Sequence, residues 1–273
     1  MGDVLEASQP ADWIPLDQAS TLYMQLPGGQ VIIRLAPEFA PNHVANIKTL
    51  VKEGFFDGLY VVRSQENYVA QWGDPAEEEA DQRPMKQGKR ALPGEFDRAI
   101  GDDLPVTILK DGDVYAPQVG FAASFPVALD PDEGRIWLTH CYSMLGAGRG
   151  DGSDSGSGAE LYVVTGHSPR HLDLNVTLAG RVVQGMEILT TLPRGTGGLG
   201  FYEDPKEYVP IESIRLGSDL PEGERANLEI LRTDTPTFEA LVEARRNRHE
   251  SWFLNPTGHI SLCNVPIPVR PAS

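Results

Sequence analysis

Residues 54–75 of the sequence read GFFDGLYVVRSQENYVAQWGDP. Residues 59–72 within it are rich in Val, Tyr and Leu, a composition typical of β-strands. Turn-forming residues at positions 64–67 interrupt this run, so the pattern predicts two short strands joined by a turn. Arg63 stands at the end of the first predicted strand.

The residues before this stretch predict a hairpin followed by a helix. Residues 21–26 (TLYMQL) and 30–35 (QVIIRL) have strand composition, and the Pro-Gly-Gly between them is a turn signal. Over residues 41–53 apolar side chains recur at helical spacing, namely Val44, Ile47, Leu50 and Val51. Pro41 suits the first turn of this helix, and Gly54 suits its end.

The residues after the stretch are predicted to be mostly strands and loops. Residues 74–118 carry an acidic run at 77–79, a basic run and several Pro and Gly, which predicts a long surface excursion. A short helix is predicted at 185–192, and strands are predicted at 120–125, 135–140, 161–165, 176–183 and 211–216. Residues 218–273 are interpreted as an appendage with one helix that opens at Thr235 and Pro236 and a Pro-rich, extended end.

Composition supports a mainly β protein and excludes several functions. The chain of 273 residues holds 28 Gly and 22 Pro, which interrupt long helices. The predicted order of strands lacks the βαβ alternation of nucleotide-binding sheets. A net charge of −16 disfavours nucleic acid and anionic membranes as partners, because both repel a negative surface. The sequence has no run of ~18 apolar residues, so no membrane insertion is expected.

The two cysteines and the N-terminus leave the compartment open. Cys141 and Cys263 are too few for a disulfide framework or a four-cysteine zinc site. Their separation in sequence does not decide whether they pair, and two unpaired, partly buried thiols are expected. Residues 1–13 lack the layout of a signal peptide. The chain is therefore either cytoplasmic, or Met1 stands where a leader was removed.

The residues around Arg63 resemble the cyclophilin family of peptidyl-prolyl isomerases. In that family a strand ends in an arginine, and an aromatic residue, a glutamine and a Gly-Asp pair follow; here these are Arg63, Tyr68, Gln71, Gly73 and Asp74. Further blocks resemble the family in the same order over roughly residues 20–217. They are the hairpin and helix at 21–53, Ser143-Met144, the strand AELYVVT at 159–165, His171-Leu172-Asp173, and LAGRVVQGM at 178–186.

The resemblance implies a fold and a domain organisation. The fold is a closed, antiparallel, eight-stranded barrel capped by two helices, with residues 74–118 as a long loop insertion. The barrel domain covers residues 20–217. Residues 1–19 are then an N-terminal arm, and residues 218–273 are a C-terminal helical and extended appendage.

The resemblance also implies a site for isomerisation of Xaa-Pro bonds, a reaction that needs no nucleophile, metal or cofactor. By resemblance Arg63 donates to the prolyl nitrogen, and Gln71 orients the guanidinium or binds a substrate carbonyl. The same resemblance places the substrate-binding residues at Tyr68, Val69, Gly146, Ala147, Tyr162, His171 and Leu172. Without the resemblance, Arg63 is more typical of a surface ion pair, and the two tyrosines are more typical of ordinary barrel-lining rings.

Departures from the family pattern modify these expectations. The family commonly has phenylalanine at the positions of Tyr68 and Tyr162, so each extra hydroxyl needs a partner or water, since an unpaired buried hydroxyl costs about 1–3 kcal/mol. The family's tryptophan falls at His171, which makes binding of the family's cyclic peptide inhibitor doubtful. The family's glutamine before the aromatic pair falls at Glu160, and its asparagine falls at Gly146.

Three readings of function follow. The first is a peptidyl-prolyl cis-trans isomerase that acts on proline-containing segments of folding polypeptides, similar to bacterial cyclophilins, some of which are exported; the periplasm is therefore placed ahead of the cytoplasm. The second is a catalytically weak or inactive binding or chaperone module on the same barrel. The third is a calcium or carbohydrate binder that uses Asp151 and Asp154. The GTGGLG run at 195–200 fits a dinucleotide motif but opens no predicted helix, so it is interpreted as a plain loop.

Overall fold

The computed structural model describes residues 2–76, 78 and 80–272, so the predicted acidic run at 77–79 falls partly outside the described residues. The chain divides into two compact units. The first, called the barrel unit below, contains Asp17–Phe96 and His140–Arg225. The second, called the accessory unit, contains Met1–Leu16, Asp97–Thr139 and Ala226–Ser273. The expected surface excursion at 74–118 is therefore divided between the two units.

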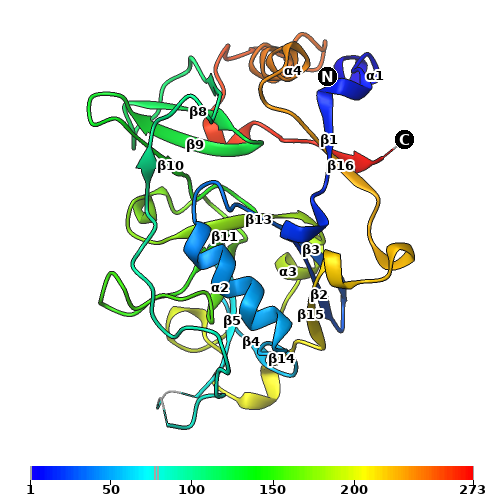
Figure 1. Cartoon of the computed structure of the whole chain (residues 1–273). Coiled ribbons are helices and arrows are strands. Elements are labelled where there is room, and N and C mark those ends of the chain that lie inside the picture. Colours follow the sequence, from blue (N-terminus) through cyan, green and yellow to red (C-terminus); the bar gives the residue numbers. More distant parts are fainter. Residues whose placement is uncertain (1, 77, 79, 273) are drawn as a thin grey trace. The chain divides into compact units, whose positions relative to one another are not determined.

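The barrel unit is built on one antiparallel sheet of nine strands among the described residues, and the prediction of a mainly β fold is confirmed (Figure 1). The strand order is β14-β4-β5-β12-β11-β13-β3-β2-β15. In chain order the strands are β2 (Thr21–Leu26), β3 (Gly29–Leu35), β4 (Tyr60–Ser64), β5 (Val69–Gly73), β11 (Met144–Ala147), β12 (Leu161–Val164), β13 (Leu178–Gln184), β14 (Val209–Pro210) and β15 (Ser213–Leu216).

The expected closed barrel of eight strands is wrong in detail, because the two edge strands of this sheet do not pair with each other. They are successive parts of one segment, residues 209–216. Its first part pairs with β4 and its second part with β2. Between them, Ile211 N–H donates to Leu59 O at 2.8 Å, and Gly58 N–H donates to Ile211 O at 2.8 Å. One continuous piece of chain thus joins both ends of the sheet, and the sheet curls without direct pairing of its edges.

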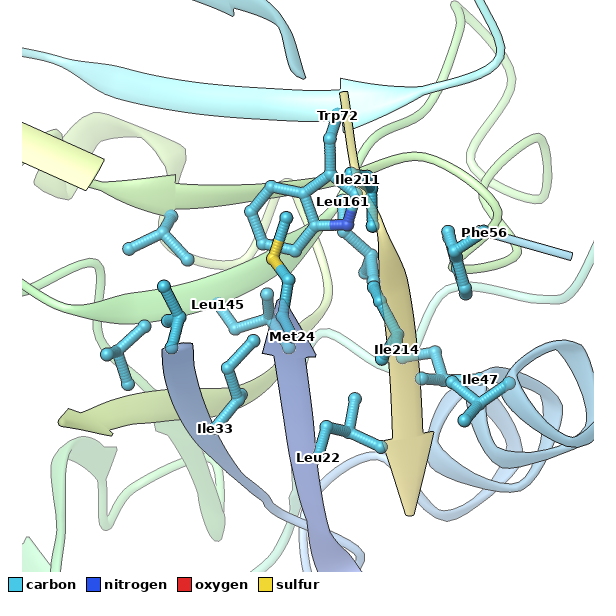
Figure 2. Close-up of a cluster of buried hydrophobic side chains, with 14 of the residues drawn as sticks. Leu22, Met24, Ile33, Ile47, Phe56, Trp72, Leu145, Leu161, Ile211 and Ile214 are labelled. Atoms are coloured by element: carbon cyan, nitrogen blue, oxygen red, sulfur yellow. The ribbon is translucent and has the colours of Figure 1, made fainter. Parts of the chain in front are cut away.

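The core of the barrel unit follows from two periodicities in the sequence. Alternate residues of the hairpin face inward, from Leu22, Met24 and Leu26 on β2 and their partners on β3. Figure 2 shows Met24, Ile33, Trp72 and Leu161 gathered with Ile47 in this core. Ile47 belongs to α2 (Pro41–Lys52), whose buried residues recur at helical spacing, as predicted. A short helix, α3 (Met186–Thr190), buries Leu189 in the same core and confirms the second predicted helix.

Residues 80–96 form a strap that is held against α2 by side-chain hydrogen bonds to the backbone. The Asn46 amide donates to Lys89 O at 2.9 Å and accepts from Lys89 N–H at 2.8 Å. The Arg83 guanidinium donates to Phe55 O at 2.9 Å, and Met85 packs against the barrel core. Single polar and apolar side chains therefore anchor this part of the predicted surface excursion to the barrel unit.

Glu95, the last anchor of the strap, caps α2 from outside the helix. Its carboxylate accepts the backbone N–H groups of Asn42 at 3.0 Å and His43 at 2.8 Å, and it contacts His43 Nδ1 at 2.7 Å. These are N–H groups that a helix leaves unsatisfied in its first turn. The N-cap residue is Ala40, whose side chain cannot accept them, so Glu95 supplies the acceptor that the helix start lacks locally.

The accessory unit contains two small antiparallel sheets. The sheet in order β6-β10-β9-β8-β7 comprises β6 (Arg98–Ala99), β7 (Val106–Ile108), β8 (Gln118–Ala122), β9 (Phe125–Asp130) and β10 (Arg135–Leu138). The other, in order β1-β16-β17, comprises β1 (Trp13–Pro15), β16 (Leu228–Leu231) and β17 (Val269–Pro271). Hydrogen bonds join the two sheets, from Ser124 Oγ to Leu231 O and from Thr107 Oγ1 to Thr233 O.

Two helices complete the accessory unit, α1 (Gly2–Glu6) and α4 (Pro236–Arg246). The predicted start of α4 is confirmed: the Thr235 side chain accepts the Phe238 N–H, and Pro236 occupies the first turn. Phe238 packs edge-on against Phe121 of β8 with ring centroids 4.9 Å apart.

The expectation of unpaired thiols is wrong, since Cys141 and Cys263 are each disulfide-bonded. Among the described residues, no helix is both long and apolar enough to cross a membrane.

Replacement of Glu95 by Ala is expected to lower the free energy of unfolding by about 1–2 kcal/mol at neutral pH, the usual effect of losing an N-cap. Burial by itself would raise the pKa of Glu95, but the N–H groups of Asn42 and His43 and the His43 ring hold this pKa below its usual value. The stabilisation is therefore complete above the unfolded-state pKa and is lost as the pH falls through the lower folded-state pKa. Urea unfolding between pH 3 and pH 8 measures it, with the exposed Glu224→Ala as control. An equal effect of both substitutions would contradict the capping role.

Candidate functional site

A β-bulge determines which way Arg63 points. Val61 of β4 pairs with Trp72 of β5, but the next pair is Arg63 with Gln71, so Val62 is an extra residue in β4. Val61 and Trp72 both lie in the barrel core. In a regular strand Arg63 would share the face of Val61 and point into that core. The bulge reverses the alternation, so Arg63 lies opposite Gln71 on the other face of the sheet.

The predicted site residues continue from Arg63 in one row across four strands. Gln71 of β5 pairs with Tyr162 of β12, and Tyr162 pairs with Gly146 of β11. The flanking residues Ala70, Leu145 and Val163 belong to the barrel core. Because side chains alternate between the faces of a sheet, Arg63, Gln71, Tyr162 and Gly146 share the face away from the core.

The Arg63 guanidinium is held by neutral acceptors. Nε donates to Leu199 O at 2.7 Å, one terminal nitrogen donates to Gln71 Oε1 at 2.8 Å, and the other donates to Gln65 Oε1. Within the described residues no carboxylate forms an ion pair with it. Burial lowers the pKa of Arg63, but an arginine remains charged. Three of its five N–H groups are used in these bonds, so two remain for a ligand.

Glu160 fixes the orientation of Gln71. The Gln71 Nε2 donates to Glu160 Oε1, so the amide oxygen is the atom left to accept from Arg63. The stem of Glu160 lies over two glycines, since a Cβ at Gly73 would stand 3.2 Å and one at Gly148 3.1 Å from its Cγ. Glu160 stands where the family has a glutamine, so a carboxylate ends the series of hydrogen bonds that runs from Arg63 through Gln71.

Aromatic rings surround the Arg63 cation. The guanidinium carbon lies 5.6 Å from the ring centroid of Tyr68 and 5.2 Å from that of Phe201, within the range of cation–π attraction. Tyr68 in turn stacks on His171, with centroids 6.4 Å apart and planes 6° from parallel. Tyr68 also packs against a small buried cluster of Val69, Tyr162 and Val164. A cation and an apolar cluster therefore meet at Tyr68.

Two predicted residues lie apart from this arrangement. Ala147 follows Gly146 on β11, so its side chain points to the opposite face and belongs to the barrel core. Its N–H donates to Thr177 O at 2.9 Å, and is therefore already used. Leu172 is half-buried in the 3₁₀ turn Arg170–Leu172, next to His171.

The structure adds residues to the site that the sequence reasoning left out. The GTGGLG run, predicted to be a plain loop, ends in the short 3₁₀ helix Gly198–Gly200 and lies against Arg63. Leu199 supplies an acceptor, and Phe201 forms a β-bridge with Arg63. The loop turns tightly, since a Cβ at Gly195 would lie 2.1 Å from Gly200 O, and Leu199 has a φ of 56°. The density of glycines in the sequence predicts a tight loop. It does not predict that the fold places this loop beside β4 and Arg63.

The geometry agrees with comparisons to known proteins. The family described as cyclophilin type peptidyl-prolyl cis-trans isomerase/CLD matches residues 21–216, and this chain belongs to that family. The crystal structure of cyclophilin AquaCyp293 from Hirschia baltica is similar, with 26% identity and a TM-score of 0.76 over 96% of this chain and 94% of that chain. That coverage includes residues of the accessory unit as well as the barrel unit.

Curated relatives match over shorter stretches. A probable peptidyl-prolyl cis-trans isomerase from Brucella suis is 41% identical over 58 residues, which are 21% of this chain and 30% of the relative. A putative thylakoid lumen peptidyl-prolyl cis-trans isomerase from Synechocystis is 25% identical over 185 residues, 64% of this chain and 44% of that protein. The chain thus matches less than half of the length of either relative.

Replacement of Gly146 by Ala is expected to destabilise the protein by about 1–3 kcal/mol, the usual cost of overpacking. The added Cβ would lie 2.2 Å from Cζ of Tyr162, which sits directly on the glycine. Urea unfolding measures the change. Gly223→Ala is the matched control, because its Cβ meets nothing within 4 Å. If the two variants were equally stable, Tyr162 would not be seated on Gly146.

Proposed function

We propose that this chain is a peptidyl-prolyl cis-trans isomerase that acts on exposed Xaa-Pro bonds of polypeptides, with Arg63 as its catalytic residue. One observation carries the proposal. Arg63 is a charged donor with two uncommitted N–H groups, held by neutral acceptors and placed 5.6 Å from the ring centroid of Tyr68. A guanidinium committed to a carboxylate would be a poorer donor, because its charge would be compensated.

The residue types suit the reaction. Rotation about an Xaa-Pro bond faces a barrier of about 20 kcal/mol, because resonance gives the C–N bond partial double-bond character. As the bond twists, the prolyl nitrogen becomes pyramidal and regains a lone pair. An N–H of Arg63 directed at that nitrogen is stronger in the twisted state than in the planar one, and only such a difference accelerates the reaction.

The other residues prepare Arg63 and receive the proline. Gln71 accepts one N–H and is itself held by Glu160, so the guanidinium has a fixed orientation before substrate arrives. Tyr68, backed by Val69 and Tyr162, offers an apolar surface to the pyrrolidine ring. His171, stacked on Tyr68, extends this surface at its exposed edge. Gly146 contributes space, since its missing side chain admits the Tyr162 ring.

The proposed ligands follow from the same residues. Proline-containing segments of folding chains fit a cation beside an apolar surface. The family's cyclic peptide inhibitor is not expected to bind well, because His171 stands where the family has a tryptophan and is already stacked on Tyr68. Neither nucleic acid nor a membrane is a proposed partner, given the net charge of −16.

We further propose an extracytoplasmic location, with the periplasm as the compartment. Both cysteines are disulfide-bonded, and such bonds persist chiefly in oxidising compartments. The name of the Synechocystis relative also mentions the thylakoid lumen for that protein. Fractionation of the native host tests this proposal, and recovery of the chain with cytoplasmic markers would contradict it.

Arg63→Ala is expected to lower kcat/KM for an Ala-Pro tetrapeptide at least tenfold, equivalent to about 1.4 kcal/mol of barrier. Protease-coupled isomerisation measures the rate, and the unfolding curve shows whether the variant is folded. Lys52→Ala, which removes one exposed cation at the end of α2, is the control and should retain the wild-type rate.

The same assay also tests the second candidate function, a binding or chaperone module without isomerase activity. If the wild-type chain shows no isomerase rate, and both it and Arg63→Ala suppress aggregation of an unfolded client equally, the barrel is a binding or chaperone module. Equal isomerase rates of wild type and Arg63→Ala would also contradict the proposed role of Arg63.

A further inference from the structure

A buried polar network of His140, Asp173 and Arg170 lies behind the aromatic cluster, and it meets the isomerase site described above at the hydroxyl of Tyr162. His140 has no exposed surface, and its Nε2 lies 2.8 Å from the hydroxyl of Tyr162. Its Nδ1 lies 2.9 Å from Asp173 Oδ1, which also accepts the His140 backbone N–H at 2.9 Å. The other oxygen of Asp173 accepts from Arg170 Nε at 2.5 Å. All four residues belong to the barrel unit.

The chemistry of the network assigns its protons. A carboxylate accepts only, so His140 must donate from Nδ1 to Asp173. Burial lowers the pKa of His140, although Asp173 opposes this effect, so the neutral ring prevails. In a neutral imidazole with a proton on Nδ1, Nε2 is an acceptor. Burial also raises the pKa of Tyr162, so its hydroxyl stays protonated and donates a hydrogen bond to His140 Nε2.

This direction of donation fixes the Tyr162 ring. Its hydroxyl is turned toward His140, and the two rings lie nearly parallel, 12° apart. Its carbon atoms rest on Gly146, where a Cβ would be 2.2 Å from Cζ. It shares a small buried cluster with Val69 and Val164, against which Tyr68 and Val176 pack. A buried hydroxyl without His140 would lack a partner and would favour rotation of the ring toward water.

We propose that His140 is a positioning residue that locks Tyr162 with its hydroxyl directed away from the proline-binding surface, so that this surface stays apolar. The proposal rests on the proposed isomerase function and extends it to a histidine that contacts no substrate. The His140–Tyr162 pair then compensates for the hydroxyl that distinguishes Tyr162 from the phenylalanine common in the family.

The expected kinetic signature is a change in KM rather than in kcat. Tyr162 supports the proline ring in the planar and the twisted state alike, and loss of such uniform binding raises KM and leaves kcat nearly unchanged. For His140→Leu, which leaves the Tyr162 hydroxyl unpaired, we expect KM for an Ala-Pro tetrapeptide to rise about tenfold with kcat within about twofold.

Two further variants separate positioning from a general loss of structure. In His140→Leu/Tyr162→Phe the unpaired hydroxyl is gone, so its KM should fall back at least about threefold from that of His140→Leu. His140→Gln keeps an acceptor near the position of Nε2 and should also recover most of the affinity. His249→Leu, an exposed histidine of the accessory unit, is the matched control and should behave as wild type.

NMR gives a readout that does not depend on catalysis. The ¹⁵N shifts of His140 at pH 7 should show the tautomer protonated at Nδ1, and the Tyr162 hydroxyl proton should exchange slowly enough to be observed in wild type but not in His140→Leu. A proton on Nε2 would overturn the inference whatever the kinetics. So would a fall in kcat at constant KM, or an equal KM for the single and double variants.

The proposed function and this inference fail in different ways. Absence of isomerase activity in wild type overturns the proposed function. In that case the NMR signals and the Kd of the same tetrapeptide, compared between wild type, His140→Leu and the double variant, decide the positioning role.

Discussion

The site depends on one extra residue in a strand. Val62 is inserted between two pairs of the β4–β5 ladder, and the shift of register turns Arg63 from the face of the barrel core to the face that carries Gln71. Without this bulge a guanidinium would point at Trp72 and its apolar neighbours, where an unpaired charge is very costly. The bulge therefore keeps the charge out of the core and places the Arg63 guanidinium beside Gln71, where it makes its hydrogen bonds.

The row of residues beyond Arg63 shows how a sheet converts distant sequence positions into a site. Gln71, Tyr162 and Gly146 are paired in register across three further strands. Gln71 is oriented by Glu160, while Tyr162 is seated on Gly146 and bonded to His140. Side chains in such a row are held from both sides, which is the pre-organisation that electrostatic catalysis requires. The acceptors around Arg63 are neutral, so the cation is oriented but its charge is not cancelled.

Local patterns predicted much of the fold correctly. The hairpin over β2 and β3, the helix α2 and the Thr235 cap of α4 were all readable, because each depends on periodicity, turn residues or capping over a few positions. The strap was predicted only as part of a long surface excursion, and its anchors could not be predicted, because Asn46 and Arg83 bond to distant backbone atoms. Ala147 was grouped with Gly146, although alternation along β11 sends the two to opposite faces.

The amino-acid sequence was enough to predict the family resemblance, the mainly β fold and the order of the arginine, the glutamine and the two tyrosines. The direction of Arg63, the placement of the GTGGLG loop beside it and the partner of the Tyr162 hydroxyl became known from the folded chain. These features differ in the distance along the chain over which they are fixed. Turn and helix signals act between near neighbours, whereas bulges, cross-strand rows and buried hydrogen bonds depend on which distant backbones the packed core brings together.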